Sequence, residues 1–166
     1  MLCYDGSEDA KHAVRRAGEL FAGRSALVLT VWQSTAVMGG FAWAGAMAPM
    51  VDYVELDRMS AEAAGKRAEE GLGVARDAGL EAEALTVRAA GPIWRTIIET
   101  ADQHRAAVIV MGPRGLTGVE SMLLGSVSSH VVHHADRPAL VIPVGATGRA
   151  STATDAIEEG PADGGR

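Results

Sequence analysis

AAVIVMGPRGLTGVESMLLGS, residues 106–126, is the most informative stretch of the chain. Ala106–Met111 is apolar and partly β-branched, which predicts a strand buried on both faces. A glycine-rich loop runs from Gly112 to Gly125, and Ser126–Ala135 is predicted to be a helix. A buried strand that passes through a glycine loop into a helix is a repeating unit of parallel α/β sheets.

The same alternation extends through the rest of the chain. Helices are predicted where apolar residues recur at helical spacing, and strands where short apolar runs stand between turn signals. The predicted helices are Ser7 (as N-cap) to Phe21, Asp52–Ala78, and one that opens at Gly91-Pro92. The predicted strands are a short one ahead of Asp5, then Ala26–Trp32, Glu83–Arg88 and Ala139–Val144. On the long helix, Val54, Met59, Ala63 and Leu72 are expected to lie broadly on one side.

The order βαβαβαβαβ predicts an α/β fold with an open, doubly wound parallel sheet and helices on both faces. Ligands of such sheets bind at the carboxyl ends of the strands, where the strand order reverses. We expect one domain over residues 1–145 and a disordered acidic tail over residues 146–166, where the composition changes to Ala, Gly, Ser and Thr with scattered acids.

Composition narrows the possible functions. The 166 residues are 48% hydrophobic, which suits a packed core, and 15 basic against 21 acidic residues give a net charge of −6. This balance argues against a nucleic-acid partner, because such proteins usually carry a basic surface. The single cysteine, Cys3, excludes an internal disulfide and a cysteine-rich zinc site, and we expect a cytoplasmic location.

Two segments bear on membranes and targeting. The N-terminal residues lack a basic region followed by a long apolar run, so no signal peptide is expected. Ala36–Val51 is almost wholly apolar, but Gly39-Gly40 and Pro49 interrupt it, and a membrane span needs about 20 apolar residues in a row. We therefore expect an apolar, glycine-rich loop and no membrane partner, with the role of the loop left open.

The loop after the fourth predicted strand has the chemistry of an anion site. It contains Gly112-x2-Gly115-x9-Gly125-Ser126. Glycines allow the backbone to approach phosphate oxygens, and successive N–H groups at a helix start attract negative charge. The alternative is a glycine-rich connection with capped helix ends. Neither a Walker A motif nor a G-x-G-x-x-G fingerprint after the first strand is present.

From Cys3 to Pro143 the chain resembles the universal stress protein family, and the glycine motif matches that of the family's ATP-binding branch. The resemblance implies an adenine nucleotide alpha hydrolase-like, Rossmann-like sandwich with strand order 3-2-1-4-5. It also implies bound ATP, with Mg²⁺ or Mn²⁺ on the nucleotide, and a homodimer formed through Ala139–Val144. Asp5 would face the adenosine, and the backbone of Val31 would meet the adenine. The ribose and phosphates would be surrounded by Gly112, Gly115, Gly125, Ser126, Val127 and Ser128.

Two features depart from the family pattern. Only four residues precede Asp5, so we expect either a shortened first strand or a natural start upstream of Met1. Pro113 lacks an N–H that a phosphate could accept. Arg114 beside it offers a compensating charge, or else is simply solvated.

Other polar residues have plainer explanations. His130 and His134 have the i, i+4 spacing of a metal pair, but we expect them, with His133, to occupy the surface or the end of the last helix. Cys3 is expected to be inert. Asp5 has a second possible role as the turn residue ahead of the first helix.

Three functional hypotheses follow. The first is a cytoplasmic, dimeric, ATP-binding regulator of the stress response that acts on an unidentified protein partner. The second is an interaction module of the same fold without a nucleotide, motivated by Pro113 and the short first strand. The third is a slow ATPase or autokinase with Ser126 and Ser128 at the phosphate end. No efficient catalytic residue is identified.

Overall fold

The structure is a computed structural model that describes residues 1–34, 52–116 and 124–144. The predicted loop Ala36–Val51, most of the glycine-rich loop beyond Leu116, and the predicted tail 146–166 lie outside the described residues.

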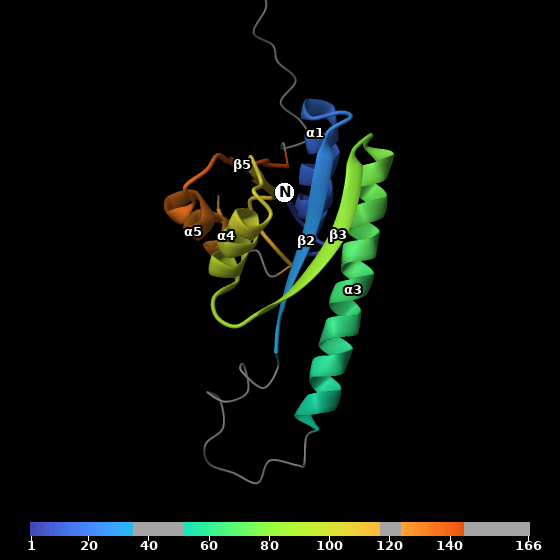
Figure 1. Ribbon diagram of the computed structural model, residues 1–166, viewed down its shortest axis with the longest axis vertical. Coiled ribbons are helices and arrows are strands. Elements are labelled where there is room, and N and C mark those ends of the chain that lie inside the picture. Colours follow the sequence, from blue (N-terminus) through green and yellow to red (C-terminus); the bar gives the residue numbers. More distant parts are fainter. Residues whose placement is uncertain (35–51, 117–123, 145–166) are drawn as a thin grey trace, which may run out of the picture.

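The described strands form one parallel five-stranded sheet in the order β3-β2-β1-β4-β5 (Figure 1). This confirms the predicted fold class and the strand order that the family resemblance implies. The strands are β1 (Leu2–Cys3), β2 (Ser25–Gln33), β3 (Glu81–Ala89), β4 (Ile109–Met111) and β5 (Ala139–Val141). The order reverses between β1 and β4, because the chain moves to one side of β1 for β2 and β3 and to the other side for β4 and β5.

The central strand β1 is very short, yet it is bonded on both sides. Leu2 is in register with Val28 of β2 and with Val110 of β4. The Tyr4 N–H donates to the carbonyl of Leu29 at 2.9 Å, which extends the pairing with β2 beyond the strand itself. β2 continues past the point where β1 ends, so the sheet has a step at this carboxyl edge.

Helices cover both faces of the sheet (Figure 1). The described helices are α1 (Glu8–Leu20), α3 (Tyr53–Asp77), α4 (Ile93–Gln103) and α5 (Ser126–His134). α1 and α3 pack on one face, whereas α4 and α5 pack on the other. The predicted N-cap is confirmed, because the Ser7 hydroxyl accepts the Ala10 N–H at 3.1 Å. Asp52 caps α3 in the same way, since its carboxylate accepts from Val54 and Glu55.

The buried side chains form one cluster on each face because residues alternate along the strands. Leu2, Val28 and Val110 point toward α1 and α3. Their neighbours Met1, Leu29 and Ile109 belong to the cluster under α4 and α5. The sheet therefore separates two buried clusters, and β1 and β4 contribute residues to both of them.

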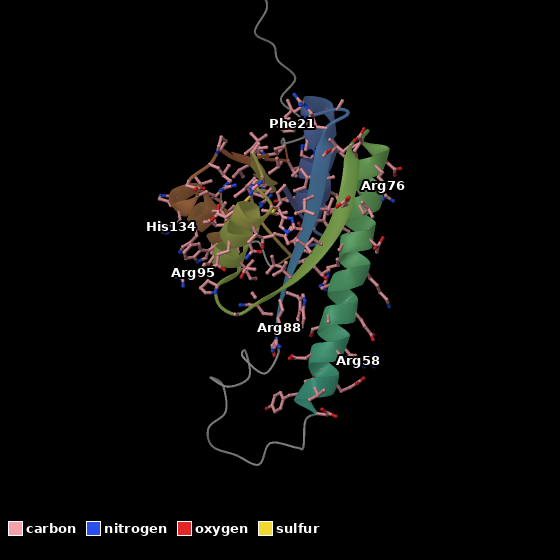
Figure 2. All side chains as sticks on the ribbon, viewed as in Figure 1. Phe21, Arg58, Arg76, Arg88, Arg95 and His134 are labelled. Carbon is pink, nitrogen blue, oxygen red and sulfur yellow. The ribbon has the colours of Figure 1, made fainter. Side chains whose placement is uncertain are left out.

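The apolar residues that the sequence analysis placed broadly on one side of α3 are not all buried. Val54 is 80% exposed and Met59 is 55% exposed, because the first half of α3 extends beyond the carboxyl ends of the strands (Figure 1). That half is held by side-chain pairs such as Arg58 with Glu55 and Glu62 (Figure 2). In the second half the buried residues are Leu72 and four small ones, namely Ala64, Ala68, Gly71 and Ala75.

Two strands are shorter than predicted. β4 begins at Ile109 rather than Ala106, because the Ala106 N–H bonds to the Ala101 carbonyl and completes the end of α4. The Ala106 carbonyl accepts from Arg137 at 2.8 Å. β5 ends at Val141, although the Ile142 N–H still reaches the Met111 carbonyl at 3.0 Å. Neither change alters the topology.

No helix in the described part of the chain is long and apolar enough to cross a membrane.

Candidate functional site

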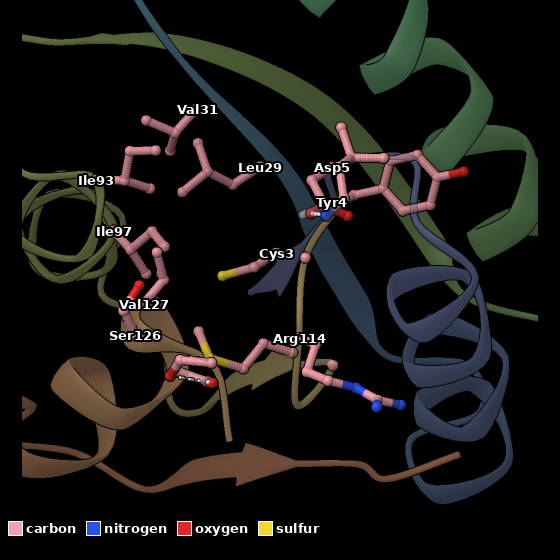
Figure 3. Close-up of a pocket in the computed structure, with 16 residues that line it drawn as sticks. Cys3, Tyr4, Asp5, Leu29, Val31, Ile93, Ile97, Arg114, Ser126 and Val127 are labelled. Carbon is pink, nitrogen blue, oxygen red and sulfur yellow. Dashed lines mark hydrogen bonds between the residues drawn. The ribbon is translucent and has the colours of Figure 1, made fainter. Parts of the chain in front are cut away.

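A cavity of about 380 Å³ opens at the carboxyl ends of β1, β2 and β4 (Figure 3). Its volume falls in the range of small-molecule sites, about 300–1,000 Å³. Its position at the reversal of strand order is where ligands of open α/β sheets bind. Every site residue that the sequence analysis singled out lines it, namely Asp5, Val31, Gly112, Gly115, Gly125, Ser126, Val127 and Ser128.

One side of the cavity is apolar. Leu29 and Val31 of β2 face Ile93 and Ile97 of α4 across it (Figure 3). Ile93 and Ile97 share a helix face, and the sequence analysis did not connect that face with the site. The i, i+2 spacing on β2 and the i, i+4 spacing on α4 are the signals that relate the two walls.

Asp5 makes two backbone hydrogen bonds at the rim of the cavity. One carboxylate oxygen accepts the Ser7 N–H at 2.9 Å, which is the turn role ahead of α1. The other accepts the Leu116 N–H at 3.1 Å and so holds the glycine loop. The turn role is therefore real, and the carboxylate nevertheless lines the cavity.

Each motif glycine lies where a Cβ atom meets something. At Gly112 the added carbon would be 2.8 Å from the backbone carbon of Asp9 on α1. At Gly115 it would be 2.6 Å from an Asp5 carboxylate oxygen, and at Gly125 it would be 3.2 Å from the Pro113 carbonyl oxygen. These glycines allow the loop to approach α1, Asp5 and itself closely.

The start of α5 faces the same cavity. Gly125 is the N-cap residue and supplies no side-chain cap to the first turn, where Ser126 and Val127 line the cavity. The Ser128 side chain is different, because its buried hydroxyl lies 2.7 Å from the Pro113 carbonyl oxygen. Pro113 also accepts the Gly125 N–H at 2.7 Å. The two ends of the loop are thus tied together at one carbonyl.

Arg114 is one of the residues that line the cavity, but its guanidinium extends toward α1 (Figure 3). Its Nε lies 3.0 Å from a carboxylate oxygen of Asp9, and the two side chains are 24% and 14% exposed. The guanidinium is therefore engaged in an ion pair on the far side of the loop from Ser126, rather than being merely solvated. The sequence analysis did not consider Asp9 as its partner.

Two protonatable side chains at the end of β1 resist ionisation. Burial raises the pKa of the Cys3 thiol to about 12, with the Asp5 carboxylate as a smaller cause. This agrees with the expectation that Cys3 is inert, because the thiolate is the reactive form. Burial, together with the nearby Glu70 carboxylate, raises the pKa of Tyr4 to about 12.

The histidines of α5 stack on α4. Trp94 lies 5.5 Å from the ring of His130 and 4.8 Å from that of His134, between ring centroids. The Nδ1 atoms of His130 and His133 bond to carbonyls one turn earlier in α5. Among the described residues, no group of three or more His, Cys, Asp or Glu side chains is placed to hold a metal ion.

An open α/β sandwich with a glycine loop at its switch point defines a class of ligand-binding proteins, and comparison with known proteins narrows it further. The sequence model of the Universal stress protein family matches residues 1–143, so the chain belongs to that family.

Curated relatives match over short segments. Universal stress protein MJ0531 of Methanocaldococcus jannaschii is 48% identical over 46 residues, which is 28% of this chain and 27% of that protein. Universal stress protein Slr1101 of a Synechocystis species is 36% identical over 64 residues, which is 39% of this chain and 59% of the relative. The chain therefore matches well under two thirds of the length of either relative.

Solved structures match over almost the whole chain. The hypothetical protein MJ0577 has a TM-score of 0.70 at 22% identity, covering 88% of this chain and 95% of that one. An Arabidopsis thaliana universal stress protein family member, solved with AMP bound, has a TM-score of 0.56 at 20% identity and covers 88% and 91%. A universal stress protein solved in complex with cAMP has a TM-score of 0.56 at 22% identity and covers 86% and 93%. At these identities the likeness supports the fold.

Proposed function

We propose that this protein binds an adenine nucleotide, ATP with its divalent ion, in the cavity at the carboxyl ends of β1 and β4. The observation that carries this proposal is the convergence of all eight singled-out residues on one cavity of suitable volume. Six of them lie in the glycine loop and the start of α5, and the fold brings Asp5, which follows β1, and Val31 of β2 to that segment.

The two ends of the cavity suit the two ends of a nucleotide. The apolar wall of Leu29, Val31, Ile93 and Ile97 suits the adenine ring, and β2 runs beyond β1 there, so its backbone is available to the base edge. The first turn of α5 has N–H groups without a side-chain cap, which suits phosphate oxygens. The family members solved with AMP and with cAMP support an adenine ligand.

The divalent ion belongs to the nucleotide in this proposal. The described residues offer no group of three metal-ligating side chains. Both oxygens of Asp5, the carboxylate at the rim, already accept backbone N–H groups. Mg²⁺ or Mn²⁺ coordinated by the phosphates would add the positive charge that the loop lacks, since Arg114 is paired with Asp9.

At the level of physiology we propose a cytoplasmic regulator of the stress response, dimeric through β5, whose bound nucleotide is read by a protein partner. A slow ATPase or autokinase is less well supported. The Ser128 hydroxyl is buried and bonded to Pro113, which leaves Ser126 as the accessible hydroxyl of that pair. A nucleotide-free interaction module is favoured by one observation, namely that the loop bonds to itself between Gly125 and Pro113.

The test is to identify any nucleotide released on denaturing the freshly purified protein, and then to titrate ATP with Mg²⁺ by calorimetry. In Gly115→Ala the new methyl would lie 2.6 Å from the Asp5 carboxylate, so we expect the affinity for ATP to fall by about tenfold or more. The matched control is Gly73→Ala, where a Cβ meets nothing within 4 Å. It should bind ATP as the natural chain does.

Absence of both released nucleotide and measurable binding in a folded sample would overturn the proposal in favour of the interaction module. Equal affinities in the natural chain and Gly115→Ala would place the nucleotide elsewhere.

A further inference from the structure

We propose that Asp9, which lies outside the cavity on α1, is a positioning residue that acts through Arg114 to hold the glycine loop where the phosphates of a nucleotide are received. This inference rests on the proposed function. It assigns a role to an ion pair that the site as described above does not use.

The Asp9–Arg114 ion pair is short and mostly shielded from solvent. The distance from Arg114 Nε to the Asp9 carboxylate is 3.0 Å, and both side chains are mostly buried. Buried pairs are screened less by salt and water than exposed ones, and the loss of one partner leaves a charge unpaired. Asp9 also belongs to the first turn of α1, where the helix dipole stabilises a carboxylate.

Asp9 restrains the loop at two points. Its side chain pairs with Arg114, and its backbone packs against Gly112 so closely that a Cβ there would be 2.8 Å away. A substitution of Asp9 is therefore expected to displace the segment Gly112–Arg114. Gly112 lines the cavity and also packs against Asp9 of α1.

The restraint continues from the loop to the proposed phosphate end. Pro113 lies between these two anchored residues, and its carbonyl accepts the Gly125 N–H and approaches the Ser128 hydroxyl, each at 2.7 Å. Gly125 and Ser128 bracket the first turn of α5. A displacement of Pro113 would thus move or release the N–H groups that we assign to phosphate.

The adenosine end has different supports. Val31 and Leu29 belong to β2, and Ile93 belongs to α4. These residues belong to the hydrophobic cluster under α4 and α5, on the face of the sheet opposite to α1, which carries Asp9. Disturbing the pair should therefore weaken the binding of phosphates while leaving the binding of the nucleoside unchanged.

The experiment is a double-mutant cycle with two ligands, adenosine and Mg²⁺-ATP, titrated by calorimetry against the full chain. Asp9→Asn and Arg114→Ala are each expected to lower the ATP affinity about tenfold, and the double variant no further, because both remove one restraint. Adenosine affinity should stay the same in all of them. Asp9→Glu keeps the charge and moves it by one methylene, so its affinity for ATP should fall less than that of Asp9→Asn.

A control variant separates positioning from general stability. Asp102→Asn breaks the pair between Asp102 and Arg137 at the end of α4. It should lower the melting temperature without changing the ratio of ATP to adenosine affinity. If Asp9→Asn does not fold, Asp9→Glu and Arg114→Ala carry the same test.

Two results would overturn the inference while the proposed function stands. If Asp9→Asn keeps or gains ATP affinity while Arg114→Ala loses it, then Arg114 is itself a phosphate ligand that Asp9 competes for. If neither variant changes the ratio of affinities, the pair has no part in the site. Failure of the natural chain to bind either ligand would instead overturn the proposed function, and this inference with it.

Discussion

Asp5 shows how much one carboxylate does at this edge of the sheet. Its two oxygens accept N–H groups from Ser7, two residues along the chain, and from Leu116, on the glycine loop. A carboxylate that accepts backbone donors on both oxygens is held in one orientation. The side chain that we expect to face the adenosine is therefore already oriented before any ligand arrives.

Cys3 and Tyr4 predict a loss of stability in alkali. In an unfolded chain the thiol would lose its proton near pH 9.0 and the phenol near pH 10.0, whereas in the folded protein both pKa values are raised to about 12. Between pH 9 and pH 12 the folded state therefore binds more protons than the unfolded state. The free energy of unfolding should therefore be unaffected by these groups below pH 9 and should fall as the pH rises toward 12.

Urea unfolding at several pH values between 7 and 11 measures this slope. Cys3→Ala and Tyr4→Phe remove one ionising group each, and each is expected to flatten the alkaline fall. The quantity to compare between the variants and the natural chain is the slope of the unfolding free energy against pH, because truncating a side chain also changes the absolute stability. Identical slopes in the natural chain and both variants would contradict the prediction.

At the residue scale, the sequence analysis named eight residues that line the cavity but not the residues with which they interact. Gly115 was chosen for its place in a spaced motif, and that its lack of a Cβ accommodates Asp5 becomes visible only in the structure. Arg114 and Asp9 are 105 residues apart in the chain. No local pattern connects such residues, so their pairing depends on the packing of the loop against α1.

At the scale of elements, α3 is the helix that the sequence described least well. Its bounds were predicted to within a residue at each end. The apolar residues that the sequence analysis placed broadly on one side include Leu72, which is buried, but the other buried residues of the helix are alanines and one glycine. Helices that lie close to a sheet need small residues at the contact, and a hydrophobicity pattern ranks those residues low.

Gly71 in α3 is expected to be required for that close contact. A Cβ on Gly71 would be 2.7 Å from the ring of Tyr4, so Gly71→Ala should lower the free energy of unfolding by about 1–3 kcal/mol. Gly65 is in the same helix, where a Cβ meets nothing within 4 Å. Gly65→Ala should instead raise the stability by about 0.5–1 kcal/mol, because alanine favours helix.

Chemical denaturation of the two variants checks this difference. Equal effects at Gly71 and Gly65 would mean that helix propensity alone governs α3 and that Tyr4 moves aside.

At the scale of the whole molecule, β5 is at one edge of the described sheet and has β4 as its neighbour. The Pro138 carbonyl accepts from Ile109, and the Ile142 N–H donates to Met111. Because alternate residues of a strand face opposite sides, Ala139 and Val141 direct their backbone groups toward the open edge. This is the edge through which the proposed dimer would form.

Val141→Pro removes an N–H from that open edge and leaves the pairing with β4 in place. We expect it to shift the proposed dimer to a monomer in sedimentation equilibrium, with ATP binding retained. A Val141→Pro protein that stays dimeric would show that the copies meet elsewhere. A natural chain that is already monomeric would contradict the proposed dimer itself.

The architecture as a whole followed from the alternation of strands and helices, and it was predicted correctly even though β1, β4 and β5 have only two or three residues each. A prediction from this alternation depends on the order of the elements, so it stays correct when the length of an element is misjudged. The lengths were less predictable, because they depend on where a neighbouring strand ends, as β5 does at Met111.

The position of β1 has a consequence for the growing chain. β1 precedes the other described strands in the chain and forms the middle of the sheet, and the hydrogen bond from Leu116 to Asp5 joins residues 111 positions apart. During synthesis β1, β2 and β3 can assemble early, but the site is completed only when β4 and α5 have left the ribosome. A nucleotide can therefore act only on chains that have been synthesised beyond α5. A chain interrupted before Ile109 would contain β1, β2 and β3 but would lack the glycine loop and α5, and so the proposed site.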